Sequence, residues 1–116
     1  MPTERVFQIA TFLQPSDGEP IRSIVTESAP ASIVAWFVKR GQCIRPHRHP
    51  HGQDTWTVLE GGGAYQVDDA GHTVLIAAGD VVVASAGSVH GVLNTGTQPL
   101  IFVSVVCPAA AGFVPV

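Results

Sequence analysis

The sequence has 116 residues, which is enough for one domain built around one hydrophobic core. Apolar residues make up 46% of the chain and charged residues only 13%, so the chain can fill a core and is not expected to be disordered. The six basic and nine acidic side chains include no run of Lys or Arg that could bind phosphates, so no nucleic-acid partner is expected.

Short segments rich in Val, Ile and Thr alternate with Gly, Pro, Asp and Ser, a pattern typical of β-strands joined by turns. In chain order, we expect strands at residues 5–12, 21–26, 32–39, 54–59, 64–67, 73–76, 81–84, 91–94 and 100–107. No segment shows the apolar stripe of an amphipathic helix. About nine short strands at this spacing predict an all-β antiparallel sandwich or barrel, in a single domain over residues 1–116.

The strands at the two ends of the sheets would have unpaired backbone groups. Such edges are often paired with a second copy of the chain, so we expect a homodimer formed through edge strands.

The longest apolar stretch, residues 100–114, contains a Ser and a Pro and is shorter than the ~20 residues that span a bilayer, so no membrane partner is expected. Residues 1–10 show no signal-peptide pattern, and the expected location is the cytoplasm. Cys43 and Cys107 are then expected to be buried thiols rather than a disulfide.

Three of the five histidines fall within residues 47–51. In an extended chain, residues two apart point to the same face, so His47 and His49 can present their rings to one metal ion. A Pro and a Gly flank His51 and indicate that the strand ends there, which makes His51 a pocket residue rather than a ligand. His90 comes much later, and a barrel brings such distant strands to one interior point. By itself, a His pair at this spacing is also a common feature of solvated loops.

Asp54 follows the histidines closely, on a strand where Gln53 faces the opposite side. Neutral imidazole binds Zn, Fe, Ni, Cu and Mn, and a carboxylate adds a neutralising charge. Three histidines and one carboxylate would leave one or two positions open for water or substrate. His72 lies in a hairpin connection at residues 68–72 and is expected to be exposed.

These residues fall within two segments that resemble the two motifs of the cupin superfamily. The first motif, which runs Gly, five residues, His-x-His, three or four residues, Glu, six residues, Gly, here reads Gly41, QCIRP, His47-Arg48-His49, PHGQ, Asp54, TWTVLE, Gly61. The second motif, which runs Gly, five residues, Pro-x-Gly, two residues, His, three residues, Asn, here reads Gly79, DVVVA, Ser85-Ala86-Gly87, SV, His90, GVL, Asn94. Every interval fits, with Asp54 in place of Glu and Ser85 in place of Pro.

The resemblance implies a double-stranded β-helix, the RmlC-like jelly-roll barrel, with motif one at residues 41–61 and motif two at 79–94. Carried over by position, it assigns the ligands of one divalent transition metal (Fe, Zn, Mn or Ni) to His47, His49, Asp54 and His90. Because Asp is one methylene shorter than Glu and the motif also allows a shorter spacing, Gln53 is kept as the alternative to Asp54. Asn94 would brace a turn.

Cupins include isomerases, dioxygenases, decarboxylases, lyases, storage proteins and sugar sensors, so the resemblance leaves the reaction open. We expect a metal-dependent enzyme of isomerase, lyase or dioxygenase type that acts on a small polar organic molecule. The alternative is a non-catalytic ligand-binding or sensor cupin with a structural metal, which predicts a filled coordination sphere and no open pocket.

The residue types and positions suggest further candidates for catalysis, for substrate binding and for the pocket wall. His51 and Tyr65 are the candidate general bases. Arg45 can hold a carboxylate or phosphate of the substrate, whereas Arg48 alternates away from the two histidine side chains. The side chains expected to form an apolar interior above the metal are Trp36, Phe37, Trp56, Tyr65, Val81, Val83, Val92 and Phe102.

Overall fold

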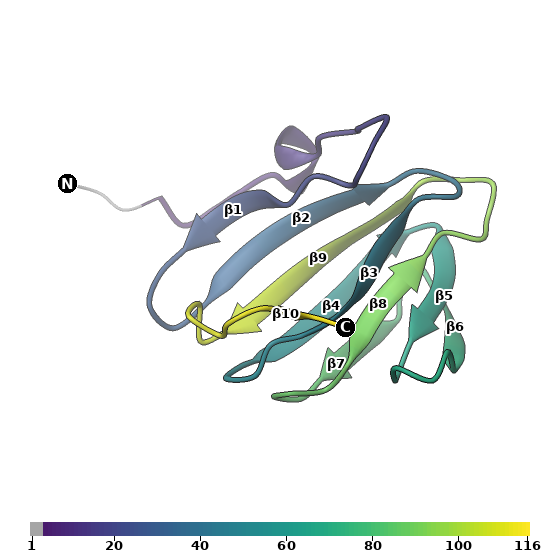
Figure 1. Cartoon of the computed structure of the whole chain (residues 1–116). Coiled ribbons are helices and arrows are strands. Elements are labelled where there is room, and N and C mark those ends of the chain that lie inside the picture. The colour runs from purple at the N-terminus through teal and green to yellow at the C-terminus, as the bar shows by residue number, and fades with distance from the viewer. Residues whose placement is uncertain (1–3) are drawn as a thin grey trace.

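The computed structural model describes residues 4–116 and forms two antiparallel β-sheets that pack face to face (Figure 1). Its strands are β1 (Ser23–Glu27), β2 (Ser32–Val38), β3 (Cys43–Arg48), β4 (Gln53–Glu60), β5 (Gly62–Gln66), β6 (Thr73–Ala77), β7 (Val81–Ala84), β8 (His90–Leu93), β9 (Leu100–Cys107) and β10 (Val114–Pro115). One sheet has the order β1-β2-β9-β4-β7 and the other has the order β10-β3-β8-β5-β6. The prediction of an all-β antiparallel barrel is therefore confirmed. No helix within residues 4–116 is long and apolar enough to cross a membrane.

From β2 onward the chain passes back and forth between the two sheets, apart from the β5–β6 hairpin, which stays in one sheet. Strands β3 and β8 pair with each other, and β4 lies in the other sheet between β9 and β7. This winding is that of the predicted double-stranded β-helix. It brings segments that are far apart in the sequence to opposite walls of one interior.

The core lies between the sheets and is built around Trp56 on β4. The Trp56 ring stacks on Phe102 of β9 with the ring centroids 4.2 Å apart, and it meets Tyr65 of β5 edge-on at 5.2 Å. Buried residues alternate along β4, at Asp54, Trp56 and Val58, because successive side chains of a strand point to opposite faces. Packing of Trp56 in the core therefore also holds Asp54 on the interior side of β4.

The prediction that Val81 and Val83 line the interior is wrong. Their side chains are 58% and 57% exposed, whereas Val82 and Ala84 face inward, opposite buried residues of β4. The β7 segment is apolar on both faces, so its register is set by pairing with β4 and not by a pattern in the sequence. Phe37 is only half-buried. The other predicted interior residues are buried or packed against the core: Trp36, Trp56, Tyr65, Val92 and Phe102.

Two segments differ from the expected strands, and one cysteine differs from its expected burial. Residues 5–12 form no strand and contain a short 3₁₀ helix, η1 (Ile9–Phe12). The His-rich segment 41–52 contains β3, and the C-terminal strand β10 pairs with it. Cys43 is half-buried and Cys107 is exposed, and both are free thiols. The predicted burial of Cys107 is wrong because this residue lies on the outward face of β9, at its end.

The buried amide of Asn94, directly after β8, links the end of β2 to the turn between β8 and β9. Its Nδ2 donates to the carbonyl oxygens of Val38 and Gln98, each at 2.9 Å, and its Oδ1 accepts from the backbone N–H of Gly96 at 2.9 Å. Only 1% of Asn94 is exposed, so these bonds replace those that water would make. Asn94 therefore braces the turn between β8 and β9, the role that the resemblance implied.

Replacing Asn94 with Ala removes these bonds and leaves two carbonyl groups without their side-chain donor. We expect the free energy of unfolding to fall by about 3 kcal/mol, measured by urea denaturation. Thr95→Ala, at the exposed neighbouring position, is the control and should cost less than about 0.5 kcal/mol. Equal losses in the two variants would contradict the bracing role.

Candidate metal centre

Three histidines and one carboxylate meet between the sheets: His47, His49, Asp54 and His90, called the His–Asp cluster below. His47 lies on β3 and His49 directly after it, His90 begins β8, and Asp54 projects from β4 in the opposite sheet. One nitrogen or oxygen atom from each side chain lies within 4.8 Å of those from the other three. His49 is half-buried and the other three are buried, so His49 is the most accessible member of the cluster.

A bulge in β3 turns the histidines inward. Ile44 and His47 are both buried although they are three residues apart, which regular alternation does not allow. The β3–β8 register shifts between these two residues, and Pro46, which has no N–H to donate, lies in the irregular part. A Cβ on Gly91 would lie 2.7 Å from the Ile44 carbonyl oxygen and 3.0 Å from the Pro46 nitrogen. Only glycine at this position lets the bulged strand pass so close to β8, next to His90.

Each histidine of the cluster is oriented by a backbone carbonyl oxygen. The Nδ1 atoms of His47, His49 and His90 lie 2.7, 2.7 and 3.1 Å from the carbonyl oxygens of Arg45, Gly112 and Ser88, respectively. A carbonyl oxygen only accepts, so each Nδ1 carries a proton, and in the neutral ring Nε2 then carries the lone pair. Carbonyl groups commonly orient metal-binding histidines in this way.

The Asp54 carboxylate points toward the Nε2 atoms. Its Oδ2 lies 3.0 Å from Nε2 of His90 and 3.3 Å from Nε2 of His49. Its Oδ1 accepts a hydrogen bond of 2.7 Å from Ser104 Oγ. Lone pairs on both Nε2 atoms would repel Oδ2, so a proton or a metal cation has to lie between these atoms. Three imidazole nitrogens and one carboxylate oxygen that converge on one point are a suitable donor set for a divalent transition metal.

Burial and hydrogen bonding set the protonation states in the His–Asp cluster. Burial lowers the pKa of His47 to about 4, so its ring is neutral at neutral pH. Burial opposes ionisation of Asp54, but hydrogen bonds from two histidines and Ser104 outweigh it and hold the pKa of the Asp54 carboxyl below its usual range. The hydrogen bond to Asp54 raises the pKa of His49 in turn. An ionised carboxylate and a neutral imidazole are the forms that bind a metal ion.

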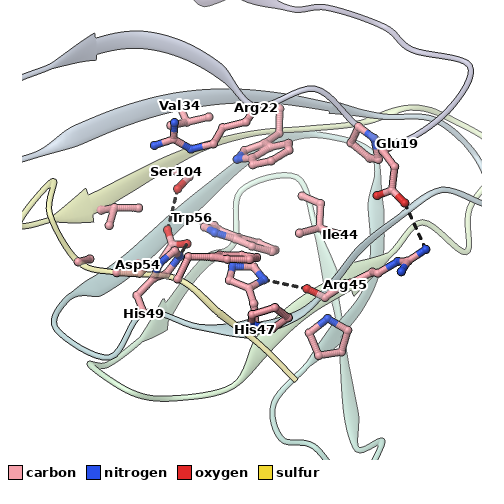
Figure 2. Close-up of a pocket in the computed structure, with 18 of the residues that line it drawn as sticks. Glu19, Arg22, Val34, Ile44, Arg45, His47, His49, Asp54, Trp56 and Ser104 are labelled. Carbon is pink, nitrogen blue, oxygen red and sulfur yellow. Dashed lines mark hydrogen bonds and ion pairs between the residues drawn. The ribbon is translucent and has the colours of Figure 1, made fainter.

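A cavity of about 690 Å³ opens onto His47, His49 and Asp54 (Figure 2). Most of its wall is apolar, with contributions from Val34, Trp36, Ile44, Trp56, Val106 and Phe113. The charged side chains of the wall, besides the cluster, are Glu19, Arg22 and Arg45. Apolar walls with a few polar groups are typical of small-molecule sites, whose volumes usually lie at roughly 300–1,000 Å³.

The C-terminal residues 108–116 supply part of this wall and hold one histidine of the cluster. Strand β10 pairs with β3, and the carbonyl of Gly112 accepts the hydrogen bond from His49. Gly112 has φ +79°, and a Cβ there would lie 3.1 Å from the proline that follows His49, so this approach requires glycine. The Phe113 ring lies 5.1 Å from the His47 ring and 6.3 Å from the His49 ring, yet Phe113 is 64% exposed.

Of the predicted apolar residues only Trp36 and Trp56 line the cavity, and the predicted polar residues Gln53, His51 and Tyr65 lie outside its wall. Gln53, the alternative to Asp54, is exposed on the outward side of β4. His51 is exposed in the turn after β3. Tyr65 is buried against Trp56, and burial raises its pKa to about 12. Neither of the two candidate general bases lines the cavity.

Of the two arginines that flank the histidines, one lies in the cavity wall and the other outside it, as their positions in the sequence suggested. Arg45 lines the cavity, whereas Arg48 lies 3.6 Å from Asp69. His72 is exposed, as expected, and lies 2.6 Å from Asp68. The residues of the wall that were not singled out from the sequence include Arg22, Ser104 and Phe113. Of these, Ser104 could have been noticed in the sequence, because it is a polar residue inside an apolar strand. Arg22 and Phe113 belong to no motif.

Comparison with known proteins finds relatives of the same fold. A family model described as a cupin domain matches residues 34–106. A crystallised conserved protein with a double-stranded β-helix domain, from Klebsiella pneumoniae, is 46% identical, with a TM-score of 0.94 and 97% of each chain covered. An RmlC-like cupin from Desulfovibrio desulfuricans is 25% identical, with a TM-score of 0.75 and coverage of 94% of this chain and 98% of the other. Germin-like protein 9-3 of rice is 35% identical over 74 residues, which cover 61% of this chain and 35% of the rice protein. The chain thus spans about a third of the length of the curated relatives it matches.

The low pKa of His47 predicts acid sensitivity of the metal-free protein. The unfolded chain takes up a proton at about pH 6.5 that native His47 takes up only at about pH 4. The stability contributed by neutral His47 is therefore complete above pH 6.5 and is lost as the pH falls toward 4. The raised pKa of His49 acts in the opposite direction around and above pH 6.5, where the native state holds more of that proton than the unfolded chain, and its effect fades as the pH falls below 6.5. Urea denaturation after chelation should show a free energy of unfolding that falls through this range.

Two variants control this measurement. His47→Gln should flatten the pH dependence between about pH 6.5 and 5, because it removes the buried imidazole, whereas the lowered pKa of Asp54 adds its own loss of stability only as the pH nears 4. His72→Gln, at an exposed position, should leave the dependence as steep as in the wild type. If both variants keep the wild-type slope, the acid sensitivity does not come from His47.

Proposed function

The chain belongs to the cupin family, and we propose that its His–Asp cluster binds one divalent transition metal that serves a reaction of a small organic molecule. The observation that carries this proposal is the cavity of about 690 Å³ that opens onto three of the four residues of the cluster. A metal held there would keep coordination positions free on the cavity side, where a substrate reaches it.

The donor set supports Fe, Zn, Mn or Ni as the ion. His47, His49 and His90 would bind through Nε2, because a backbone carbonyl holds the Nδ1 proton of each ring. Asp54 would bind through Oδ2, because Ser104 occupies its other oxygen. The ion, when bound, would act as a Lewis acid toward an oxygen atom of the substrate.

In this proposed reaction, the side chains of the cavity wall would bind and orient the substrate. The apolar walls would cover the apolar part of a substrate, and the charged groups of the wall, which are half exposed or more, would bind its polar part. Within residues 4–116, the titratable side chains of the wall are Glu19, Arg22, Arg45 and three members of the His–Asp cluster. His51 and Tyr65 are not among them. The reaction we propose is of isomerase, lyase or dioxygenase type, and Glu19 is the carboxylate of the wall that lies outside the cluster.

The second candidate is a non-catalytic ligand-binding or sensor cupin. A purely structural metal is usually closed off by protein ligands, so the open cavity favours an exchangeable ligand over a structural role. Binding and catalysis differ in turnover. The enzyme proposal predicts conversion of at least one compound among sugar acids, keto acids and thiols, lost on chelation and restored by one particular metal. A metal-loaded protein that binds such compounds without converting them would support the second candidate.

We also propose that the protein works in the cytoplasm as a homodimer formed through edge strands. Strands β1 and β7 are the edges of one sheet, and β6 and β10 are the edges of the other. The exposed apolar side chains of β6 and β7 support association: Val74, Leu75, Val81 and Val83. Light scattering that gives the mass of one chain in solution would contradict the dimer.

The metal site is tested by elemental analysis of protein purified without added metal. The wild type should contain about one equivalent of a transition metal per chain. His90→Ala should lose most of this metal, because the buried His90 ring is one of the four proposed donors. His72→Ala, at an exposed position, is the matched control and should keep the wild-type content. Equal metal in the wild type and in His90→Ala, with both variants folded by circular dichroism, would refute the site.

A further inference from the structure

Of the two arginines in the cavity wall, Arg22 has the more distant carboxylate partner within residues 4–116. Arg45 is paired with Glu19 at 3.3 Å, and both side chains are more than two-thirds exposed, so this pair is well solvated. Within residues 4–116, the ion-pair partner of Arg22 is Glu27, at 3.9 Å. The same Glu27 oxygen already accepts a hydrogen bond of 2.8 Å from Ser32 Oγ. The charge of Arg22 is therefore weakly compensated.

Arg22 also lies within electrostatic range of the His–Asp cluster. It lines the same cavity as His49 (Figure 2), and its positive charge acts to lower the pKa of His49. Its guanidinium donates one hydrogen bond of 3.2 Å, to Ser32 Oγ, and its side chain is 50% exposed. Most of its five N–H donors are therefore free to bind a ligand in the cavity.

The apolar part of the wall includes an aromatic ring that water still reaches. Phe113 packs against the rings of His47 and His49, yet it is 64% exposed. Trp36, which is half-buried, lines the same cavity. A ligand with an apolar body would remove more of these two rings from water, which is favourable in proportion to the area covered.

We infer that the cavity binds an organic carboxylate, with its anion on Arg22 and its apolar body against Trp36 and Phe113. A guanidinium binds a carboxylate through two parallel N–H···O bonds, a geometry that few neutral ligands can match. The volume of about 690 Å³ leaves room for a body of several carbon atoms. This inference deepens the proposed function, because a metal in the His–Asp cluster adds a second positive group for the same anion.

Benzoate and benzamide test the role of the anion, because they have nearly the same shape and differ in charge. In calorimetric titrations of the metal-loaded protein, we expect benzoate to bind about tenfold more tightly than benzamide, or better. Phenyl phosphate carries a different anion on a similar body. Tighter binding of phenyl phosphate than of benzoate would overturn the assignment to carboxylates.

Variants of the arginines test where the anion binds. Arg22→Gln should weaken benzoate binding about tenfold or more and leave benzamide binding unchanged. Arg22→Lys, which keeps the charge without the planar fork, should retain part of the benzoate affinity. Arg48→Gln is the matched control, since Arg48 pairs with Asp69 outside the wall, and it should change neither affinity. Phe113→Ala should weaken both probes alike, because it removes a contact with the ring that they share.

Metal content measured on the same samples separates this inference from the proposed function. If the protein loads with metal but benzoate has no advantage over benzamide, or if Arg22→Gln behaves like Arg48→Gln, the inference is overturned and the metal site stands. If the protein does not load with metal, the proposed function fails, and the same comparisons on the metal-free protein decide the role of Arg22. Absence of benzoate binding in the millimolar range overturns the inference in either form.

Discussion

The contact between Asp54 and the histidines joins the two sheets of the barrel at its interior. Asp54 is only 5% exposed, and a buried carboxylate is costly unless hydrogen bonds or charges compensate it. Here Ser104, His49 and His90 contact its two oxygens at 2.7–3.3 Å. Asp54 shares the inward face of β4 with Trp56, around which the core is built, so a shift of β4 by one residue would disrupt the core and the cluster together.

The histidine side of the cluster depends on local backbone irregularities. The bulge of β3 at Pro46 allows Ile44 and His47 both to face inward, and Gly91 leaves room for the bulged strand. Gly112 brings a carbonyl to His49 from the far end of the chain. These features place imidazole Nε2 atoms before any ion is bound, so little reorganisation would accompany binding.

The spacing of the histidines and the two motifs were enough to predict the barrel and to single out the four residues that meet inside it. This succeeded because side-chain direction in strands follows a period of two and because the motif intervals agree over both segments. The register of β7 was not predictable, since Val81, Val82 and Val83 are apolar on both faces. The contributions of Arg22 and residues 108–116 were not predictable either, because both depend on contacts with segments far away in the sequence and carry no local pattern.

The coordination of a single ion by both sheets is tested most directly by anomalous diffraction from crystals of protein purified without added metal. Data collected at the absorption edges of Fe, Zn, Mn and Ni identify the element as well as its position. We predict one peak within about 2.0–2.3 Å of Nε2 of His47, His49 and His90 and of Oδ2 of Asp54. No peak at the cluster, with the direct contact between His90 and Asp54 intact, or a peak bound by Gln53 instead of Asp54, would contradict the proposed centre.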